Sequence, residues 1–555
     1  MHNKAISNLL EETADLLDLH QENEFRSKAI RSSAFAVSKI EQGLCGLSLD
    51  EIASFKGVGK STATKILEIC AKGDFQEHLE LISKTPAGIL ELFDIKGLGP
   101  KKIALLWKGL GVESPGELLY ACNENRLVSL KGFGEKTQAE IKKNLEFKAS
   151  QKGFFHYAKA EAYADSFISV LKSNNFNHDL SFVGDFRRKC EVVKQIDLFT
   201  KASYHDFLSV LDKLNEAGFQ FLHNDDIQSK FNSSGGPDFV IHHDGENPVW
   251  SVFNLTGPEL HVSGVKSKLG IENPENQIWA DEKAIYFAAG LSFIEPEMRD
   301  LDGFVSASWK IVDNDDLKGC LHNHSTYSDG ASTLKEMANA CKAQGLQYFA
   351  ICDHSKSAFY AGGLKEEDVI RQHIEIDQLN KELKPFVIFK GIESDILTDG
   401  SLDYSDEVLA SFDVVVASIH SGLKMDEEKA TARIIKAVEN PYTTILGHPT
   451  GRLLLSRQGY PLDHRKVIDA CAANGVAIEL NAHPYRLDID WRWLNTAIEK
   501  GVLISINPDA HHTDGISDMR FGVNVARKAG IGAHHVLNAM DLNAFMSWLS
   551  NRKMS

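Results

Sequence analysis

The chain has 555 residues and should contain several domains, since one domain usually spans about 100–200 residues. With 43% hydrophobic and 25% charged residues it is ordinary globular material with ample apolar sequence for cores. The net charge of −17 argues against a broad basic surface, but residues 1–150 contribute only −1 of it, so local DNA contacts are compatible with the charge.

No apolar run of 18 residues occurs, and the first residues lack a signal-peptide pattern. We therefore expect a cytoplasmic protein with no membrane partner; the sequence does not set its oligomeric state. The eight cysteines include no C-x-x-C pair. Neither a zinc ribbon nor a disulfide framework is indicated, and reduced thiols are expected.

Residues 4–43 carry apolar side chains at helical spacing and are predicted to form packing helices. A short pattern then occurs three times between predicted helices, at 55–61, 95–102 and 130–136: an apolar residue, Lys-Gly, a second apolar residue and Gly. Glycine permits a backbone with positive φ. Free N–H groups at the start of the next helix can meet a phosphate oxygen, supported by a nearby lysine.

The three copies resemble the helix-hairpin-helix motif, which binds the DNA backbone without reading its sequence. One such Gly-x-Gly is more often an ordinary helix connection, but three copies favour DNA binding. The first copy resembles the small lyase-type domain of X-family DNA polymerases (1–80), and the other two resemble their fingers domain (81–150). The expected DNA contacts are Gly57, Gly59, Lys60, Gly97, Gly99, Lys101, Gly132, Gly134 and Lys136.

Within 1–80, Lys65 aligns with the lysine that forms a Schiff base at abasic sites in relatives with 5′-deoxyribose-phosphate lyase activity. Such a nucleophile requires an amine with a depressed pKa. Ser61 stands where active lyases commonly have a lysine, so a plain surface lysine is the alternative that the sequence favours.

Residues 151–315 resemble the palm and thumb of X-family polymerases, an α+β nucleotidyltransferase-like fold. The resemblance rests on 184–198, which is similar to the signature G-S-x-R-R followed by D-x-D. Nucleotidyl transfer needs paired carboxylates to hold two Mg²⁺ ions. Here Gln195 replaces the first aspartate and leaves Asp197, and Asp185 replaces the serine that contacts the triphosphate.

Two further departures affect the same site. The third carboxylate is either Asp238 or has been replaced by Phe239, and 254–257 keeps a Thr-Gly turn but lacks the aromatic pair that receives the incoming nucleotide. We therefore expect a palm retained as a scaffold for DNA, with polymerisation lost. Mg²⁺ is expected in the palm only if the polymerase is active.

Residues 316–555 alternate apolar runs of strand length with helical patterns, which predicts a parallel sheet. The predicted strands are 321–324, 347–352, 386–392, 413–420, 443–447, 476–481 and 502–507, and the helices include 333–344, 365–382, 426–438, 463–473 and 491–500. In barrels built from such units the chemistry gathers at the C-terminal ends of the strands.

Potential metal ligands follow almost every one of these strands. His322 and His324 are two residues apart, so that in a strand their imidazoles face the same side, and Asp329 follows in the next loop. A lone histidine is more often structural. Six histidines and three carboxylates at one topological position favour a metal site, and mixed imidazole and carboxylate ligands suit Mn, Zn or Fe.

These motifs, among them His322-x-His324, Asp353-His354-Ser355 and Gly447-His448-Pro449, resemble the PHP (polymerase and histidinol phosphatase) domain that bacterial X-family DNA polymerases carry C-terminally. The resemblance implies a distorted (β/α)7 barrel with three divalent metal ions, Mn²⁺ favoured and Zn²⁺ or Fe possible, that hydrolyses phosphoesters. In the polymerase-linked branch it implies a 3′→5′ exonuclease. Its ligand positions carry over as His322, His324, Asp329, His354, Glu393, His420, His448, Asp509 and His511.

The expected chemistry is phosphodiester hydrolysis. Clustered cations lower the pKa of bound water and neutralise phosphoryl oxygens. Glu393 is expected to bridge cations that His322 and Asp509 help to hold. Lys356 and Arg452, beside ligand motifs, are either phosphate clamps or solvated surface residues.

Together these features predict a DNA-repair nuclease that grips a gap, nick or primer end through its hairpins and hydrolyses the 3′-terminal phosphodiester in the barrel. The first alternative is an active X-family polymerase whose PHP domain proofreads. The second is a non-catalytic scaffold that binds DNA ends. Which of exonuclease, 3′-phosphatase or abasic-site cleavage dominates is left open by the sequence.

Overall fold

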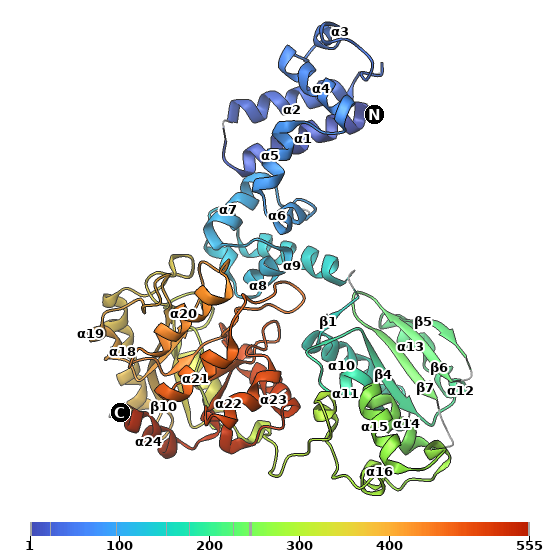
Figure 1. Ribbon diagram of the computed structural model, residues 1–555, viewed down its shortest axis with the longest axis vertical. Helices are drawn as coiled ribbons and strands as arrows, with labels where there is room; N and C mark the ends of the chain where they lie inside the picture. Colours follow the sequence, from blue (N-terminus) through green and yellow to red (C-terminus); the bar gives the residue numbers. More distant parts are fainter. Residues whose placement is uncertain are drawn as a thin grey trace. The chain divides into compact units, whose positions relative to one another are not determined.

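The chain divides into two compact units, Met1–Glu146 and Phe147–Ser555 (Figure 1). The computed structural model describes residues 3–22, 24–40, 42–95, 97–150, 153–176, 178–225, 227–243 and 247–552. In this described part, no helix is long and apolar enough to cross a membrane. The predicted divisions at residues 80 and 315 stay predictions.

The described residues of the first unit form helices joined by short loops and turns. Its helices are α1 (Asn3–Leu19), α2 (Glu24–Ser38), α3 (Leu49–Ser54), α4 (Lys60–Lys72), α5 (Gln76–Lys84), α6 (Ala87–Leu92), α7 (Pro100–Leu110), α8 (Pro115–Asn123), the 3-10 helix η1 (Arg126–Ser129) and α9 (Glu135–Ser150). The apolar faces of these helices meet in one core of their own.

The three predicted hairpins have the same backbone geometry. The first glycine of each is left-handed, with φ of 89° at Gly57, 94° at Gly97 and 95° at Gly132. Beside it, the amide of the second apolar residue donates to the carbonyl three residues earlier at 3.0–3.1 Å. That apolar side chain is buried in each copy, so the turn is held both by its hydrogen bond and by the core.

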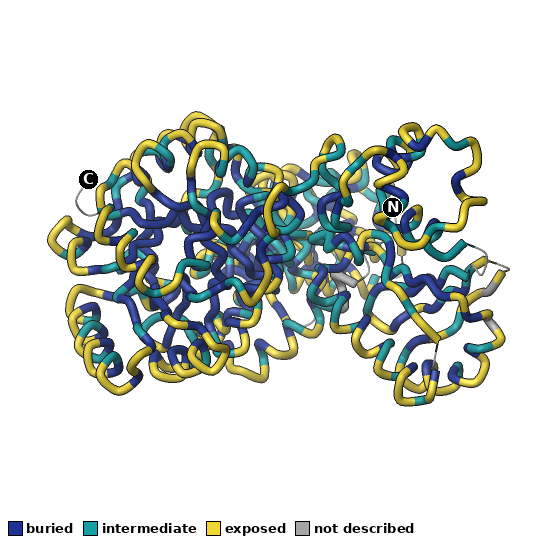
Figure 2. The backbone as a smooth tube through the Cα atoms, turned by 90° about the horizontal axis from the view of Figure 1, so that it is seen from below, coloured by how far each residue is buried: buried dark blue, intermediate teal, exposed yellow. Residues whose placement is uncertain are grey.

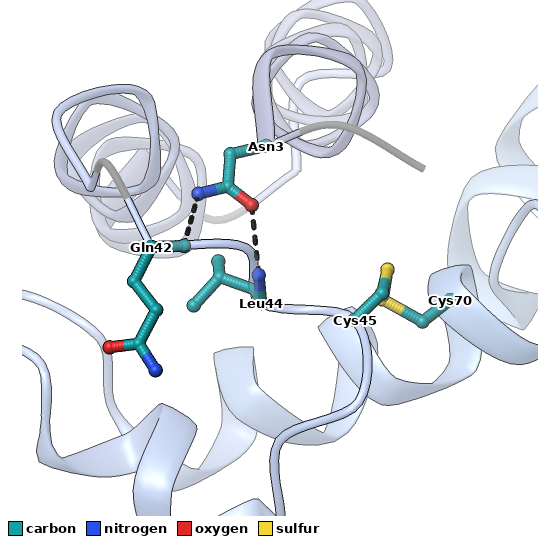
Figure 3. The surroundings of a disulfide bond; sticks show 5 residues. All are labelled: Asn3, Gln42, Leu44, Cys45 and Cys70. Atoms are coloured by element: carbon teal, nitrogen blue, oxygen red, sulfur yellow. Dashed lines mark hydrogen bonds between the residues drawn. A yellow bond between two sulfur atoms is a disulfide. The ribbon is translucent and has the colours of Figure 1, made fainter.

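One expectation about the cysteines is wrong. Cys45 and Cys70 form a disulfide between the loop before α3 and the end of α4 (Figure 3). Asn3 accepts a hydrogen bond from the Leu44 amide and donates to the Gln42 carbonyl, which ties this loop to the start of α1. The two cysteines are 25 residues apart, and such a spacing cannot reveal a pair that only the fold brings together.

The second unit begins with the palm and thumb, whose α+β architecture agrees with the prediction. Its elements are β1 (Phe155–His156), α10 (Tyr157–Ser173), β2 (Leu180–Val183), α11 (Gly184–Arg187), β3 (Val192–Val193), β4 (Gln195–Thr200), α12 (Tyr204–Phe207), α13 (Leu211–Glu216), β5 (Phe219–Asn224), β6 (Gln228–Ser233), β7 (Asp238–His243), α14 (Pro248–Thr256), α15 (Glu259–Leu269) and α16 (Glu282–Ala288). Five strands form one sheet in the order β2-β4-β7-β6-β5, in which only β4 and β7 are parallel.

The barrel follows, as predicted, with seven parallel strands in sequence order. Its strands are β8 (Gly319–Cys320), β9 (Tyr348–Ile351), β10 (Val387–Asp395), β11 (Val414–Ser418), β12 (Ile445–Leu446), β13 (Ala477–Asn481) and β14 (Ile504–Asn507). Its helices are α17 (Leu334–Ala343), α18 (Glu366–Glu382), α19 (Asp406–Leu409), α20 (Glu427–Val438), α21 (His464–Asn474), α22 (Leu494–Glu499), α23 (Met519–Lys528) and α24 (Leu542–Arg552). Most residues of these strands are buried, and Figure 2 shows dense buried backbone in the part of the molecule that carries the C-terminus.

One predicted strand lies wholly outside the strand that forms there. The ladder between β8 and β9 ends at Cys320, so the predicted strand 321–324 lies just beyond it. There Asn323 forms a parallel bridge with Ala510, and the His324 amide donates to the Ala510 carbonyl at 2.8 Å. This link between the ends of β8 and β14 nearly closes the barrel and sets both histidines at its C-terminal mouth.

The palm and the barrel share a continuous apolar core and a buried ionic joint. Lys528 of α23, 1% exposed, donates to Asp300 at 2.6 Å, and Arg188 of the palm donates to the other Asp300 oxygen at 3.0 Å. Phe521 of α23 packs edge-on against Tyr157 at the start of α10. Helix α23 is therefore the main element that ties the two folds together.

Candidate metal centre

The nine predicted ligands all lie at the C-terminal mouth of the barrel. They follow β8 (His322, His324, Asp329), β9 (His354), β11 (His420), β12 (His448) and β14 (Asp509, His511), while Glu393 lies near the end of β10. Parallel strands end at one rim, so residues up to 189 positions apart in sequence become neighbours. Most of them are buried.

Glu393 is at the centre of the cluster. Its Oε1 lies 2.9 Å from His448 Nε2, 3.1 Å from His420 Nε2 and 3.4 Å from His322 Nε2. Its Oε2 lies 2.9 Å from His354 Nδ1 and 3.7 Å from His324 Nε2. A carboxylate so surrounded can bridge more than one cation.

Three overlapping groups of side chains could each hold a metal ion. They are His324 with Asp329, His354 and His511; His322 with His324 and Asp509; and His354 with Glu393 and His420. Within each group the ligand atoms lie within 4.8 Å of one another. The donor set mixes imidazole nitrogens and carboxylate oxygens, which suits Mn, Zn or Fe.

The hydrogen bonding of the cluster fits bound cations. His322 Nε2, His324 Nδ1, both ring nitrogens of His354, and Glu393 Oε2 are buried without a hydrogen-bond partner. Buried polar atoms in proteins are almost always satisfied, so several unsatisfied ones on the same surface are explained by a ligand. The side chains present therefore fit the metal ions that this type of barrel implies.

The surroundings of the ligand side chains shift their pKa values in different directions. Burial, together with the neighbouring His511 and His354, lowers the pKa of His324 to about 3. Burial alone would also lower the pKa of His420, but the carboxylates of Glu393 and Asp395 raise it to about 10. Burial likewise opposes ionisation of Glu393, yet the histidines around it hold its pKa well below the ordinary value. The central carboxylate is thus ionised, which a ligand for cations requires.

Asp509 has a backbone conformation that is unusual for its residue type, with φ of 53°. A non-glycine residue in the left-handed region is strained, and such strain concentrates at functional sites. The turn brings Asp509 Oδ1 within 3.0 Å of His324 Nε2. The Asp509 carbonyl is 3.0 Å from His511 Nδ1, so that turn also positions a second ligand.

Sequence reasoning missed four buried residues around the ligands. Glu479 lies 2.7 Å from His322 Nδ1, Asp395 lies 2.5 Å from His420 Nδ1, and Arg486 Nε lies 3.6 Å from Asp509 Oδ2. Asp353 accepts hydrogen bonds from the amides of Ser325 and Ser328 and so holds the loop that carries Asp329. A signal for two of them was present: Asp395 shares a face with Glu393 two residues away, and Glu479 lies in the predicted strand 476–481, which has no motif ligand.

The two proposed phosphate clamps are engaged elsewhere. Lys356 donates to Glu366 at 2.8 Å. Arg452 donates to the Asp490 carboxylate at 2.5 Å and to the Arg486 carbonyl at 2.9 Å, which ties it to the loop after β13. The structure does not bring these two side chains into the ligand cluster, and a role in phosphate binding stays a prediction.

The hairpin residues predicted to contact DNA lie at helix N-termini. Gly59, Gly99 and Gly134 immediately precede α4, α7 and α9. Lys60, Lys101 and Lys136 are all exposed, and Lys101 forms an ion pair with Glu24 at 3.0 Å. The first and third hairpins therefore place an exposed lysine at a helix N-terminus, where a phosphate can bind, whereas the lysine of the second is paired with a carboxylate.

Lys65, the candidate lyase nucleophile, is not a solvated surface lysine. It forms an ion pair with Glu77, and its ammonium lies 5.4 Å from the centre of the Phe75 ring. Glu77 is shared with Arg26 at 2.6 Å. The amine is thus held in a half-buried ionic cluster of the first unit.

The predicted palm residues lie on two neighbouring strands. Gln195 pairs with Asp238 across β4 and β7, so their side chains share a face with Asp197 and His242. Asp197 Oδ1 is 2.8 Å from Gln195 Nε2 and 2.9 Å from His242 Nε2. Asp238 instead accepts from Asn232 at 2.8 Å. Among the described residues, every cluster that could hold a metal ion lies in the barrel.

The signature arginines of the palm are also occupied. Arg187 pairs with Glu282 of α16 and donates to the Thr256 hydroxyl at 2.8 Å. Arg188 donates to Asp185 at 2.6 Å and to the Thr256 carbonyl at 2.6 Å, besides its bond to Asp300. Both guanidinium groups are thus bound to carboxylates of this chain.

Comparison with known proteins agrees with this architecture. Family models match at residues 1–75 (helix-hairpin-helix domain), 89–146 (SAM-like helix-hairpin-helix tandem) and 321–483 (PHP domain). The DNA polymerase/3'-5' exonuclease PolX of Bacillus subtilis (strain 168) is 35% identical over 580 aligned positions, which cover 99% of each chain. The chain belongs to the PolX family. As a member of that family it combines DNA-binding helix-hairpin-helix domains with a metal-dependent phosphoesterase domain.

Shorter proteins match part of this PolX-family chain. A probable phosphatase of Thermoanaerobacter sp. (strain X514) is 30% identical over 249 residues, 42% of this chain and 94% of its own length. A probable phosphatase of Caldanaerobacter subterraneus is 31% identical over 207 residues, 34% of this chain and 74% of its own. The PHP match ends at residue 483, yet Asp509 and His511 complete the ligand cluster beyond it.

Proposed function

We propose that this chain removes nucleotides from the 3′ end of DNA in a reaction that depends on divalent cations bound in the barrel. The observation that supports this most directly is the gathering of nine ligand side chains at one mouth, with Glu393 in contact with five of the histidines. We further propose three cations held among the nine ligands, with Mn²⁺ favoured and Zn²⁺ or Fe as alternatives. The Bacillus subtilis relative is named as a 3'-5' exonuclease.

Each part of the site has a distinct role in this proposal. When bound, the cations supply a hydroxide near neutral pH and neutralise phosphoryl oxygens. Glu393 and the histidines around it would hold them, and Asp509 fixes the position of His324. The hairpins of the first unit hold the backbone of a gapped, nicked or primer-end DNA by their amides and lysines.

We propose that the palm no longer polymerises DNA. The single aspartate of the signature, Asp197, is engaged by Gln195 and His242, and Asp238 bonds Asn232. Arg187 and Arg188 of the signature are bound to Glu282 and Asp300. A nucleotide bound at this site would lack paired carboxylates for Mg²⁺.

The test uses a 3′-end-labelled primer on a gapped duplex with Mn²⁺. We expect progressive shortening by the wild type and loss of it in His322→Ala and Asp509→Ala; digestion undiminished in both purified variants would refute the assignment. Adding dNTPs tests the alternative of an active polymerase, which the retained palm sheet and the name of the Bacillus relative favour. Robust primer extension would overturn the argument for an inactive palm. Specific DNA binding without any hydrolysis would instead support a non-catalytic scaffold.

A further inference from the structure

Strand β13 differs from the other barrel strands described above because no motif ligand follows it. Its end is nevertheless polar, with Glu479 and Asn481 both fully buried on the face that points to the ligand cluster. Placing a carboxylate in a protein interior is costly unless its charge and hydrogen bonds are used. Glu479 and its neighbour should therefore serve the cluster.

Both oxygens of Glu479 accept hydrogen bonds from residues at the mouth. Oε1 accepts from His322 Nδ1 at 2.7 Å and from Asn507 Nδ2 at 3.1 Å. Oε2 accepts from the His448 amide at 2.8 Å and from Asn481 Nδ2 at 3.3 Å. With Nδ1–H donated to Glu479, His322 must present the lone pair of Nε2 to the cluster.

Asn481 extends this control to a second ligand. Its Nδ2 also lies 3.1 Å from Asp509 Oδ2, which leaves Asp509 Oδ1 facing His324 at 3.0 Å. Glu479 and Asn481 thus orient His322 and Asp509. Those two ligands belong to the same group, that of His322, His324 and Asp509.

Asp395 plays the matching part for a different group. Its Oδ1 accepts from His420 Nδ1 at 2.5 Å, and its Oδ2 accepts from the Ser357 hydroxyl at 2.8 Å. His420 Nε2 then faces Glu393 Oε1 at 3.1 Å. His420 belongs to the group of His354, Glu393 and His420, so the two buried carboxylates serve separate groups.

We propose that Glu479 and Asp395 are positioning residues, each of which sets the affinity of one cation site by fixing the ring orientation and tautomer of one histidine ligand. Glu479 controls the His322–His324–Asp509 site, and Asp395 controls the His354–Glu393–His420 site. The inference rests on the proposed function only in that the barrel binds cations. Partners of this kind typically change metal affinity by about 10–100-fold.

The test compares Glu479→Gln with Asp395→Asn. All four hydrogen bonds to the Glu479 carboxylate come from donors, so the NH2 group of a glutamine would have to face one of these donors. An asparagine in place of Asp395 could instead donate to the Ser357 hydroxyl and still accept from His420. We expect Glu479→Gln to weaken one Mn²⁺ site by about 10–100-fold and to leave the others within about twofold of the wild type. Asp395→Asn should weaken a different site by less. Titration of the metal-stripped full-length protein and the Co²⁺ absorption spectrum report each site without any activity measurement.

Double variants assign each effect to its site. Adding Glu479→Gln to His322→Ala should change affinity less than it does in the wild type, because only the path through Asn481 and Asp509 remains, whereas adding it to His420→Ala should act independently. Glu282→Gln, a palm carboxylate bound by Arg187 and Arg299, is the matched control and should keep wild-type affinities. If Glu479→Gln unfolds, Asn481→Ser should weaken the same site through Asp509.

The inference is overturned if the two carboxylate variants bind Mn²⁺ like the wild type, or if both weaken the same site. Its failure can be told apart from failure of the proposed function. If each carboxylate variant weakens its own cation site but the wild type leaves DNA intact, only the proposed exonuclease activity is contradicted. A wild type that digests DNA while both variants bind cations normally contradicts only the role of the two carboxylates.

Discussion

Replacing Asp300 by asparagine tests the ionic joint between palm and barrel. Asp300 accepts from Lys528 at 2.6 Å and from Arg188 at 3.0 Å. Without the carboxylate, the Lys528 ammonium, 1% exposed, retains the Arg188 carbonyl at 3.1 Å, the Cys190 sulfur at 3.8 Å and the Trp491 ring, whose centre is 5.2 Å away, but no negative charge among these contacts. Breaking a buried ion pair costs about 3–5 kcal/mol. Because the Asp300 side chain is 20% exposed, we expect the lower end, a loss of about 3 kcal/mol in the free energy of unfolding.

The assay is urea unfolding of the full-length protein followed by tryptophan fluorescence. Lys528→Met should cost less than Asp300→Asn, because it removes the buried charge and leaves Asp300 paired with Arg188. Glu382→Gln, at an exposed pair with Lys335, is the control and should leave the unfolding midpoint unchanged. An Asp300→Asn protein within about 1 kcal/mol of the wild type, or a Lys528→Met protein less stable than it, would refute the account of the joint.

Three other predictions concern pH, DNA binding and the disulfide. Burial opposes ionisation of Asp300, but Lys528 and Arg188 lower its pKa, so its contribution to stability is present above the unfolded pKa of about 3.9 and is lost as pH falls through the lower folded value. Lowering the pH should therefore reduce the free energy of unfolding more in the wild type than in Asp300→Asn. Equal reductions in the two proteins would contradict this. Lys60→Ala should weaken binding to DNA duplexes of any sequence. It should also lower the slope of log affinity against log salt concentration by about 1, the loss of one phosphate contact, as measured by fluorescence anisotropy. Cys45→Ser should destabilise the first unit by about 3 kcal/mol, from the 25-residue separation of the pair, and a reductant should then have no further effect on its melting.

Features set by local geometry were predictable from the sequence. The hairpin glycines at 57, 97 and 132 need positive φ, and short patterns encode that need. Strand and helix periodicity likewise predicted the barrel and placed ligands such as His420 and His448 at one rim. Only the strand predicted at 321–324 was displaced, because Asn323 leaves the β8–β9 ladder to bridge Ala510.

Features set by contacts between distant residues were not predictable. Glu479 and His322 are 157 positions apart, and nothing local to β13 identifies the partner. Gln195 could be recognised as a departure, but the second donor to Asp197, His242 on the neighbouring strand, could not. Arg452 and Lys356 looked available because their acidic partners, Asp490 and Glu366, lie outside the motifs.

Helix α23 also limits how the catalytic part of this protein can be isolated. A fragment cut at residue 315 would keep every cation ligand, yet it would uncover Phe521, now 3% exposed, and leave Lys528 without Asp300. Such a surface favours self-association. A minimal nuclease prepared from this chain would therefore need a redesigned outer face on α23, or should begin before β1.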